Sequence, residues 1–171
     1  DPEARQYIDG SAFHLYGGTI EALRDVHEAH PDKNLYFTEQ WIVAPGNFAG
    51  DLAWHVKNLV IGASRNWCKT VLEWNLAADP QQNPHTIGGC TECLGAVTIG
   101  EKVVRNPAYY IIAHASKFAR PGAVRVASNI TMSLPNVAFK TPSGKIVLVV
   151  LNESKKSQEF NIRFHNKQIT N

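Results

Sequence analysis

The chain has 171 residues, of which 44% are hydrophobic and 19% are charged, and this composition is typical of a globular protein. No apolar run approaches the roughly 20 residues that a membrane-spanning helix requires. The net charge of +2 is too small to indicate a nucleic-acid partner. Partners must therefore be inferred from individual sites.

The first 121 residues alternate between predicted strands and helices, which is the pattern of a (β/α)8 barrel or a doubly wound sheet. The predicted strands are residues 11–16, 35–37 and 69–73. The predicted helices are residues 20–30, 51–66 and 107–118. Thr19 and Asn106 are the predicted N-caps of the first and third helices. Residues 79–105 are rich in Pro and Gly and have little periodicity, which indicates a functional loop.

The helix predicted to begin at Gly50 and Asp51 carries one apolar face. Its members recur at helical spacing and are Leu52, Val56, Leu59, Val60 and Ala63. Trp54 and Trp67 lie at or near core spacing, so they are predicted to pack inside the protein.

After Pro121 the apolar period changes to two, and only strands are predicted. They are residues 124–128, 137–140, 146–151 and 159–164. The turn Thr141-Pro142-Ser143-Gly144 predicts a hairpin between the second and third of them. Residues 146–151 have no polar face and should lie at the centre of their sheet, whereas 159–164 alternate and should have one solvated face. The sequence therefore predicts two closely packed domains, residues 1–121 and 122–171.

Three successive strand ends combine polar and aromatic side chains. These residues are His14 and Tyr16, then Glu39, Gln40 and Trp41, then Glu73, Trp74 and Asn75. In a barrel all three ends would open on the same face, where the chemistry of such folds is placed. A carboxylate beside an aromatic ring suits a glycosidase, although a strand-end Glu can also simply cap a nearby helix. Three such ends together favour a carbohydrate pocket over polar groups satisfied within the core.

Cys90 and Cys93 form a C-x-x-C within the long loop. Such a pair can be half of a zinc site, a redox pair or a local disulfide. Zinc would need two further ligands, and a redox motif should open a helix after a strand, so a disulfide that stiffens a substrate loop is favoured. It would fit an oxidising compartment and predicts a secreted or periplasmic protein. Cys68, at a strand start, is predicted to be a small buried residue.

Several segments together resemble glycoside hydrolase family 30, the glucosylceramidase-like enzymes. They are Ala12-Phe-His-Leu-Tyr16, Leu35-Tyr-Phe-Thr-Glu-Gln40, Leu72-Glu-Trp-Asn-Leu-Ala77, Ala113-His-Ala-Ser-Lys-Phe118 and Arg120-Pro-Gly122. The resemblance spans most of the chain and keeps the order and approximate spacing of the family. It implies the last part of a (β/α)8 TIM barrel followed by strands of a β-sandwich side domain.

The resemblance also implies roles for individual residues. Glu39 would be the nucleophile at the end of the seventh strand, and His14 and Tyr16 would line the pocket from the sixth. Trp74 would stack on the sugar from the eighth strand, and Glu73 would support the pocket floor.

The chain departs from the family in one important respect. A retaining glycosidase needs a second carboxyl group about 5 to 5.5 Å from the nucleophile, which the family places in an Asn-Glu-Pro motif, and this sequence has no such tripeptide. The chain begins Asp1-Pro2-Glu3, and its length is below the roughly 250 residues of a complete barrel. We therefore expect a C-terminal fragment that lacks the acid/base, is inactive alone, and pairs with the N-terminal part of the same polypeptide.

The predicted function is that of a retaining hydrolase that cleaves β-glucosidic bonds in a β-glucan oligosaccharide or β-glucoside. The loop from His85 to Gly95 looks more like that of bacterial members, several of which cut β-1,6-glucan. The alternative enzyme is a glucosylceramide hydrolase, and the alternative of another class is a non-catalytic carbohydrate-binding or architectural fragment. No metal or organic cofactor, nucleic acid or transmembrane segment is expected.

Overall fold

The structure is a computed structural model that describes residues 1–131, 133–164 and 167–169. Its helices are α1 (Pro2–Arg5), α2 (Ala22–Ala29), α3 (Phe48–His55), the π-helix η1 (Val56–Ala63) and α4 (Pro107–Ser116). The strands of four or more residues are β1 (Gly10–His14), β2 (Asn34–Glu39), β4 (Cys68–Val71), β10 (Asn136–Lys140) and β11 (Ile146–Val150). The shorter strands are β3 (Ile42–Val43), β5 (Ala77–Ala78), β6 (Cys93–Leu94), β7 (Val97–Ile99), β8 (Val103–Arg105), β9 (Val124–Val126), β12 (Ile162–Phe164) and β13 (Lys167–Ile169).

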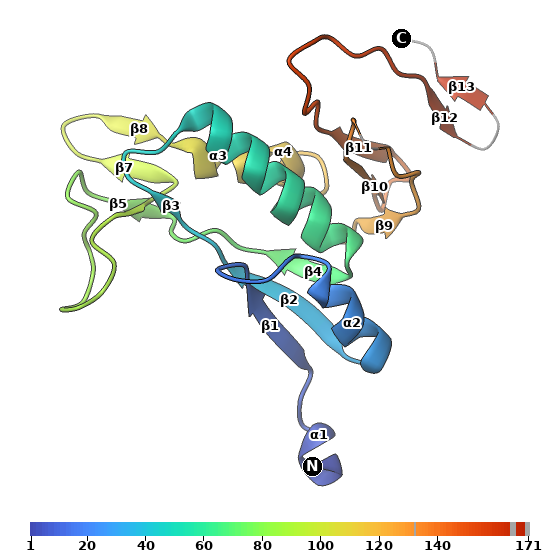
Figure 1. The fold of residues 1–171 in the computed structure, drawn as a ribbon, viewed down its shortest axis with the longest axis horizontal. Helices are drawn as coiled ribbons and strands as arrows, with labels where there is room; N and C mark the ends of the chain where they lie inside the picture. Colours follow the sequence, from blue (N-terminus) through green and yellow to red (C-terminus); the bar gives the residue numbers. More distant parts are fainter. Residues whose placement is uncertain (132, 165–166, 170–171) are drawn as a thin grey trace.

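A parallel sheet of order β1-β2-β4 organises the first part of the chain. Leu35 and Phe37 of its central strand are 1% and 0% exposed, which confirms the predicted buried strand. They pack in one apolar cluster with Leu23 of α2 and Leu59 of η1. Figure 1 shows α2 and the long helix formed by α3 and η1 lying along this sheet. Helices against a parallel sheet are the arrangement that the alternating pattern predicts.

The predicted N-cap of the first long helix is wrong. The helix α2 begins at Ala22, and its N-cap is Glu21, which makes no capping hydrogen bond through its side chain. The carbonyl of Thr19 instead accepts a hydrogen bond from the Ala22 amide at 3.2 Å. Residues 19–22 therefore form a turn, and this turn carries Ile20 into the core, where it is 6% exposed.

The helix α3 begins at Phe48, earlier than predicted, because Asn47 caps it. Asn47 Oδ1 accepts from the Gly50 amide at 3.2 Å, and Asp51 Oδ2 accepts from the Asn47 amide at 2.6 Å. The two side chains satisfy backbone donors reciprocally at the start of the helix. Such a capping pair moves the helix boundary ahead of the first apolar residue of the buried face.

The apolar face predicted for this helix is confirmed, but the two tryptophans do not join it. Four members of the face are at most 3% exposed, and they are Val56, Leu59, Val60 and Ala63. Trp54 and Trp67 are 41% and 40% exposed, so the prediction that they pack in the core is wrong. Trp54 lies two residues from Leu52 and therefore projects from the opposite side of the helix. Trp67 follows the helix with a φ of 66° and stacks on the half-buried His27, at 4.2 Å between ring centroids.

The segment predicted as an irregular loop, residues 79–105, contains three short strands. The strand β6 pairs antiparallel with β3, and β7 pairs with β5 and in antiparallel register with β8. Asn106 precedes α4 as predicted, but its side chain does not cap the helix. Its Nδ2 donates instead to Gly95 O at 2.7 Å and to Thr98 Oγ1 at 2.8 Å. Residues 79–92 remain as an extended loop. The strands β6, β7 and β8 are only two or three residues long, too short for periodicity to reveal, and the partner of β6 lies far earlier in the chain.

A second, antiparallel sheet has the order β11-β10-β9. The predicted hairpin between β10 and β11 is confirmed, but the central strand is β10, so the central position predicted for residues 146–151 is wrong. The strand β10 buries Asn136, Val137 and Ala138, whereas Val149 is the only buried residue of β11. An apolar strand can pack one residue into the core and still lie at the edge of its sheet.

The last predicted strand is shorter than expected. Only its end, β12, is a strand, and it pairs with β13 in a separate two-stranded ribbon. Phe160 and Phe164 are 51% and 39% exposed, so the alternation of residues 159–164 does not correspond to a buried face here.

The two parts of the chain share one apolar cluster. Val137 and Val149 of the antiparallel sheet pack with residues of η1 and α4, including Val60 and Ile111. Arg65, at the end of the long helix, adds polar contacts to the same junction. Its guanidinium donates to the carbonyl oxygens of Ser128 and Asn136 at 3.1 and 2.9 Å, and to Ser128 Oγ at 2.9 Å.

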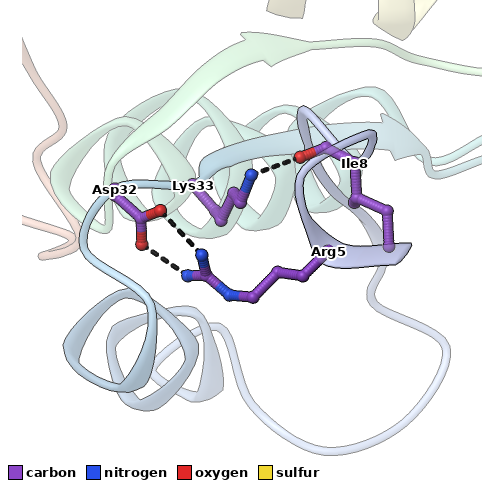
Figure 2. Close-up of polar contacts among 4 residues, drawn as sticks. All are labelled: Arg5, Ile8, Asp32 and Lys33. Carbon is purple, nitrogen blue, oxygen red and sulfur yellow. Dashed lines mark hydrogen bonds and ion pairs between the residues drawn. The ribbon is translucent and has the colours of Figure 1, made fainter. Parts of the chain in front are cut away.

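The amino-terminal helix α1 is tied to the turn that precedes β2 (Figure 2). Arg5 forms a bidentate ion pair with Asp32, with distances of 2.6 and 3.0 Å. Lys33 Nζ donates to the Ile8 carbonyl at 2.6 Å. Within the part of the chain that the structure describes, no helix combines the length and apolar character needed to cross a bilayer.

Candidate active site

The carboxyl ends of β1, β2 and β4 meet at one edge of the parallel sheet. His14 lies opposite Glu39 across the β1–β2 register, after an irregularity at Phe13. The pairing continues past the end of β2, where the Trp74 amide donates to the Gln40 carbonyl at 2.7 Å and Trp41 bridges to Trp74. The three strand ends predicted to converge therefore do so, as parallel strands require.

Glu39 lies at the centre of this edge with a side chain that is 31% exposed. Its Oε1 accepts a hydrogen bond from the Tyr16 hydroxyl at 3.0 Å and lies 3.7 Å from His14 Nδ1. Partial burial of the hydroxyl, its hydrogen bond to Glu39 and the negative charges of Glu39 and Glu73 raise the pKa of Tyr16. Tyr16 therefore stays protonated at neutral pH and keeps donating to the carboxylate.

An open depression of about 330 Å³ surrounds the Glu39 carboxylate, a volume near the lower end for ligand pockets. Its lining residues are Tyr16, Glu39, Trp41, Trp74, Cys90 and Cys93. Trp74 is 46% exposed, and the peptide bond between Trp74 and Asn75 is cis. Aromatic rings around a carboxylate can stack on the apolar face of a sugar while the charged group reacts with it.

Glu73 lies behind this depression rather than in its lining. Its carboxylate pairs with His55 Nδ1 at 2.8 and 3.0 Å, and the two side chains are 3% and 6% exposed. Burial raises the pKa of Glu73, and His55 opposes that rise. Glu73 is thus engaged by a residue of the adjacent helix and does not face the solvent of the depression.

Gln40 and Asn75, which are also predicted site residues, do not line the depression. Gln40 is 8% exposed, and neither its Oε1 nor the Oδ1 of Asn75 has a hydrogen-bond partner among the described residues. His55 is not among the predicted site residues, and no local motif indicates its pairing with Glu73. Its position on the buried side of the helix, 18 residues before Glu73, was the only available signal.

Cys90 and Cys93 form a disulfide with a Cα–Cα distance of 5.6 Å. The structure places it beside Glu39, in the wall of the depression. Within the described ranges, no group of three or more His, Cys, Asp or Glu side chains is arranged to hold a metal ion.

A parallel sheet covered by helices, with a carboxylate and aromatic side chains at its carboxyl edge, defines the class of (β/α) barrel folds. Residues 1–119 match the glycosyl hydrolase family 30 TIM-barrel domain, and residues 122–170 match the glycosyl hydrolase family 30 β-sandwich domain. The chain belongs to glycosyl hydrolase family 30, and its fold is the carboxyl-terminal part of the TIM barrel followed by the β-sandwich domain.

Individual relatives carry two kinds of name. The chain is 34% identical over 161 residues to the endo-1,6-β-D-glucanase neg1 of Aspergillus fumigatus, covering 88% of this chain and 32% of that protein. It is 29% identical over 167 residues to the putative glucosylceramidase 4 of Caenorhabditis elegans, covering 91% and 32%. The solved endo-β1,6-glucanase BT3312 superposes with a TM-score of 0.90 at 35% identity, over 99% of this chain and 39% of that one. The chain therefore spans about a third of the length of the curated relatives that it matches.

Proposed function

We propose that this chain carries the nucleophile of a retaining β-glycosidase and that Glu39 is that nucleophile. The observation that carries the proposal is the Glu39 carboxylate, which is partly exposed in an aromatic depression and is held by the Tyr16 hydroxyl. Membership of a glycosyl hydrolase family supports the reaction class.

In the proposed reaction, Glu39 attacks the anomeric carbon of the bound sugar. A bond forms between a carboxylate oxygen and that carbon while the glycosidic carbon–oxygen bond breaks, and water then displaces Glu39 with overall retention. The contacts of Glu39 with Tyr16 and His14 both go to Oε1, which favours Oε2 as the attacking oxygen. The Tyr16 hydrogen bond orients the carboxylate before it attacks.

The leaving oxygen needs a proton from a second carboxyl group. Glu73 is a poor candidate because it is buried against His55. We therefore propose that a further segment of the same polypeptide supplies the acid/base. This proposal is supported by the relatives, because the chain matches only about a third of the length of each. Residues 1–121 would contribute barrel elements, and residues 122–171 would belong to the side domain.

The proposed substrate is a β-1,6-linked glucan, because two relatives named as endo-β-1,6-glucanases share 34% and 35% identity with the chain. Glucosylceramide is the second candidate, because the chain also resembles a putative glucosylceramidase over 91% of its length. The disulfide beside the site supports a secreted or periplasmic location.

The function is tested by incubating the complete polypeptide that contains residues 1–171 with β-1,6-glucan, β-1,3-glucan and glucosylceramide. Proton NMR during the first minutes reports the anomer of the new reducing end. We expect hydrolysis of β-1,6-glucan with initial release of the β-anomer. An initial α-anomer would exclude the retaining mechanism, and cleavage of glucosylceramide alone would favour the second substrate.

Trp74 provides a prediction about sugar binding. Replacing Trp74 with Ala should lower kcat/KM, because stacking and desolvation at the reacting sugar are lost. The loss should correspond to about 1 to 3 kcal/mol of transition-state stabilisation. Trp67→Ala is a matched control, since Trp67 is similarly exposed but does not line the depression. Steady-state kinetics on the complete polypeptide would contradict the assignment if both variants lost activity equally.

A further inference from the structure

Trp74, the proposed sugar-stacking residue, is held through the backbone on both sides. On its amino side, its own amide donates to the Gln40 carbonyl at 2.7 Å. On its carboxyl side, the carbonyl of the next residue, Asn75, accepts from the Ala96 amide at 2.7 Å, and the parallel pairing of β5 with β7 continues this contact. The position of the indole therefore depends on where residues 95–98 lie.

Residues 95–98, which we call the support segment, pack tightly against the residues that follow Trp74. Gly95 is buried, and a Cβ placed on it would lie only 2.8 Å from the Ala78 amide nitrogen and from Asn75 Oδ1. The backbone of the support segment is thus in direct contact with the chain that leads away from the indole. Because close-packed groups transmit displacements, a shift of the support segment would reach the residues beside Trp74.

Asn106 holds the support segment through three hydrogen bonds. Its side-chain Nδ2 donates to Gly95 O at 2.7 Å and to Thr98 Oγ1 at 2.8 Å. Its backbone amide donates to the Ala96 carbonyl at 2.9 Å. Ala96 is the residue whose own amide bonds to Asn75, so only one residue separates the bonds of Asn106 from the chain next to Trp74.

The helix α4 gives these bonds a fixed reference. Asn106 directly precedes this helix, and Ala108 and Ile111 in its first turns are 1% and 0% exposed within an apolar cluster. Figure 1 shows β5, β7 and β8 side by side, with β8 leading into α4. Asn106 therefore connects a helix that is anchored in the core to the segment that holds Trp74.

We propose that Asn106 is a positioning residue of the glycosidase: its side-chain amide fixes the support segment, and the support segment holds the Trp74 indole in place beside Glu39. This inference rests on the proposed function. Asn106 does not line the depression, so it acts on the substrate only through Trp74. A residue that served the fold alone would lower stability without an effect that depends on the indole.

A double-variant cycle on the complete polypeptide tests this inference, with β-1,6-glucan as substrate, or glucosylceramide if that is the substrate cleaved. Asn106→Ala leaves the Gly95 carbonyl without this donor, and kcat/KM should fall by about threefold to tenfold. In the Trp74→Ala background the same change should lower kcat/KM by less than about twofold, because the residue through which Asn106 acts is gone. Its effect on the melting temperature should persist in both backgrounds.

Asn66→Ala is the matched control. Asn66 Nδ2 donates to the Gly62 carbonyl at 3.0 Å, so this variant also removes a hydrogen bond from an asparagine side chain to a glycine carbonyl. Asn66 is 5% exposed and does not line the depression. Asn66→Ala should lower the melting temperature and leave kcat/KM unchanged.

Asn106→Asp provides a second variant, of nearly the same volume, if Asn106→Ala does not fold. Its carboxylate cannot donate to the Gly95 carbonyl, so the same cycle should give the same non-additive loss. An equal fall in kcat/KM with and without Trp74, or no fall in either case, would overturn the inference and leave the glycosidase proposal intact. Unchanged kinetics in Trp74→Ala alone would overturn the role of Trp74, and this inference with it. Failure of the unmodified protein to hydrolyse either substrate would overturn the proposed function itself.

Discussion

Glu39→Gln should abolish turnover of β-glucan by the complete polypeptide, with a loss of several orders of magnitude in kcat. Glutamine has nearly the same volume, and its amide oxygen can still accept the hydrogen bond from Tyr16. Because Glu39 is partly exposed and at the edge of the sheet, the change should leave the melting temperature nearly unaltered. Initial rates and thermal unfolding, measured on the same preparation, separate loss of chemistry from loss of fold.

Chemical rescue tests the role of Glu39 more directly. Glu39→Ala leaves space for azide, which should attack the anomeric carbon of an activated substrate and give an azide product of inverted configuration. Glu28→Gln is the matched control, because Glu28 is an exposed carboxylate on α2. Activity of Glu39→Gln close to that of the unmodified protein would refute the nucleophile assignment.

The convergence of the three strand ends could be predicted because it depends on local signals. A short apolar run such as Leu35 to Phe37 is too short for a helix and too apolar for a solvated strand. Once such a strand is parallel to its neighbours, its carboxyl end must share an edge with theirs. The polar residue that follows each strand therefore reaches the same edge, whatever the details of packing.

The contacts between distant elements could not be predicted from the same signals. His55 and Glu73 meet because a helix packs across a strand, and their separation of 18 residues has no periodic signature. The sequence predicts one irregular loop from 79 to 105 because β6 finds its partner in β3, far earlier in the chain. In the same way, the apolar character of residues 146–151 indicates packing but does not specify which neighbour provides the hydrogen bonds.

The His55–Glu73 pair leads to the second large expected effect. His55→Ala removes the partner of a carboxylate that is 3% exposed, and breaking a buried ion pair in this way costs about 3 to 5 kcal/mol of unfolding free energy. His114→Ala is the matched control, because His114 is exposed at the end of α4 and should change stability little. Urea unfolding of the complete polypeptide measures both variants.

The pH dependence of the loss identifies its cause. Burial raises the pKa of Glu73 and His55 opposes the rise, so the pKa should be higher still in His55→Ala. A buried carboxyl group with a raised pKa stabilises the fold fully below its unfolded-state pKa and loses that contribution as the pH rises through its folded-state pKa. The stability difference between the unmodified protein and His55→Ala should therefore be larger at pH 8 than at pH 5.

A double variant separates the stranded charge from the lost volume. His55→Ala/Glu73→Ala removes the uncompensated carboxylate, so its destabilisation at pH 8 should be smaller than the sum of the two single variants. Because Glu73 directly precedes Trp74, loss of the pair should also displace the indole and raise KM for glucan. A pH-independent loss, additive in the double variant, would show that His55 contributes packing alone and does not hold a charged Glu73 beneath the site.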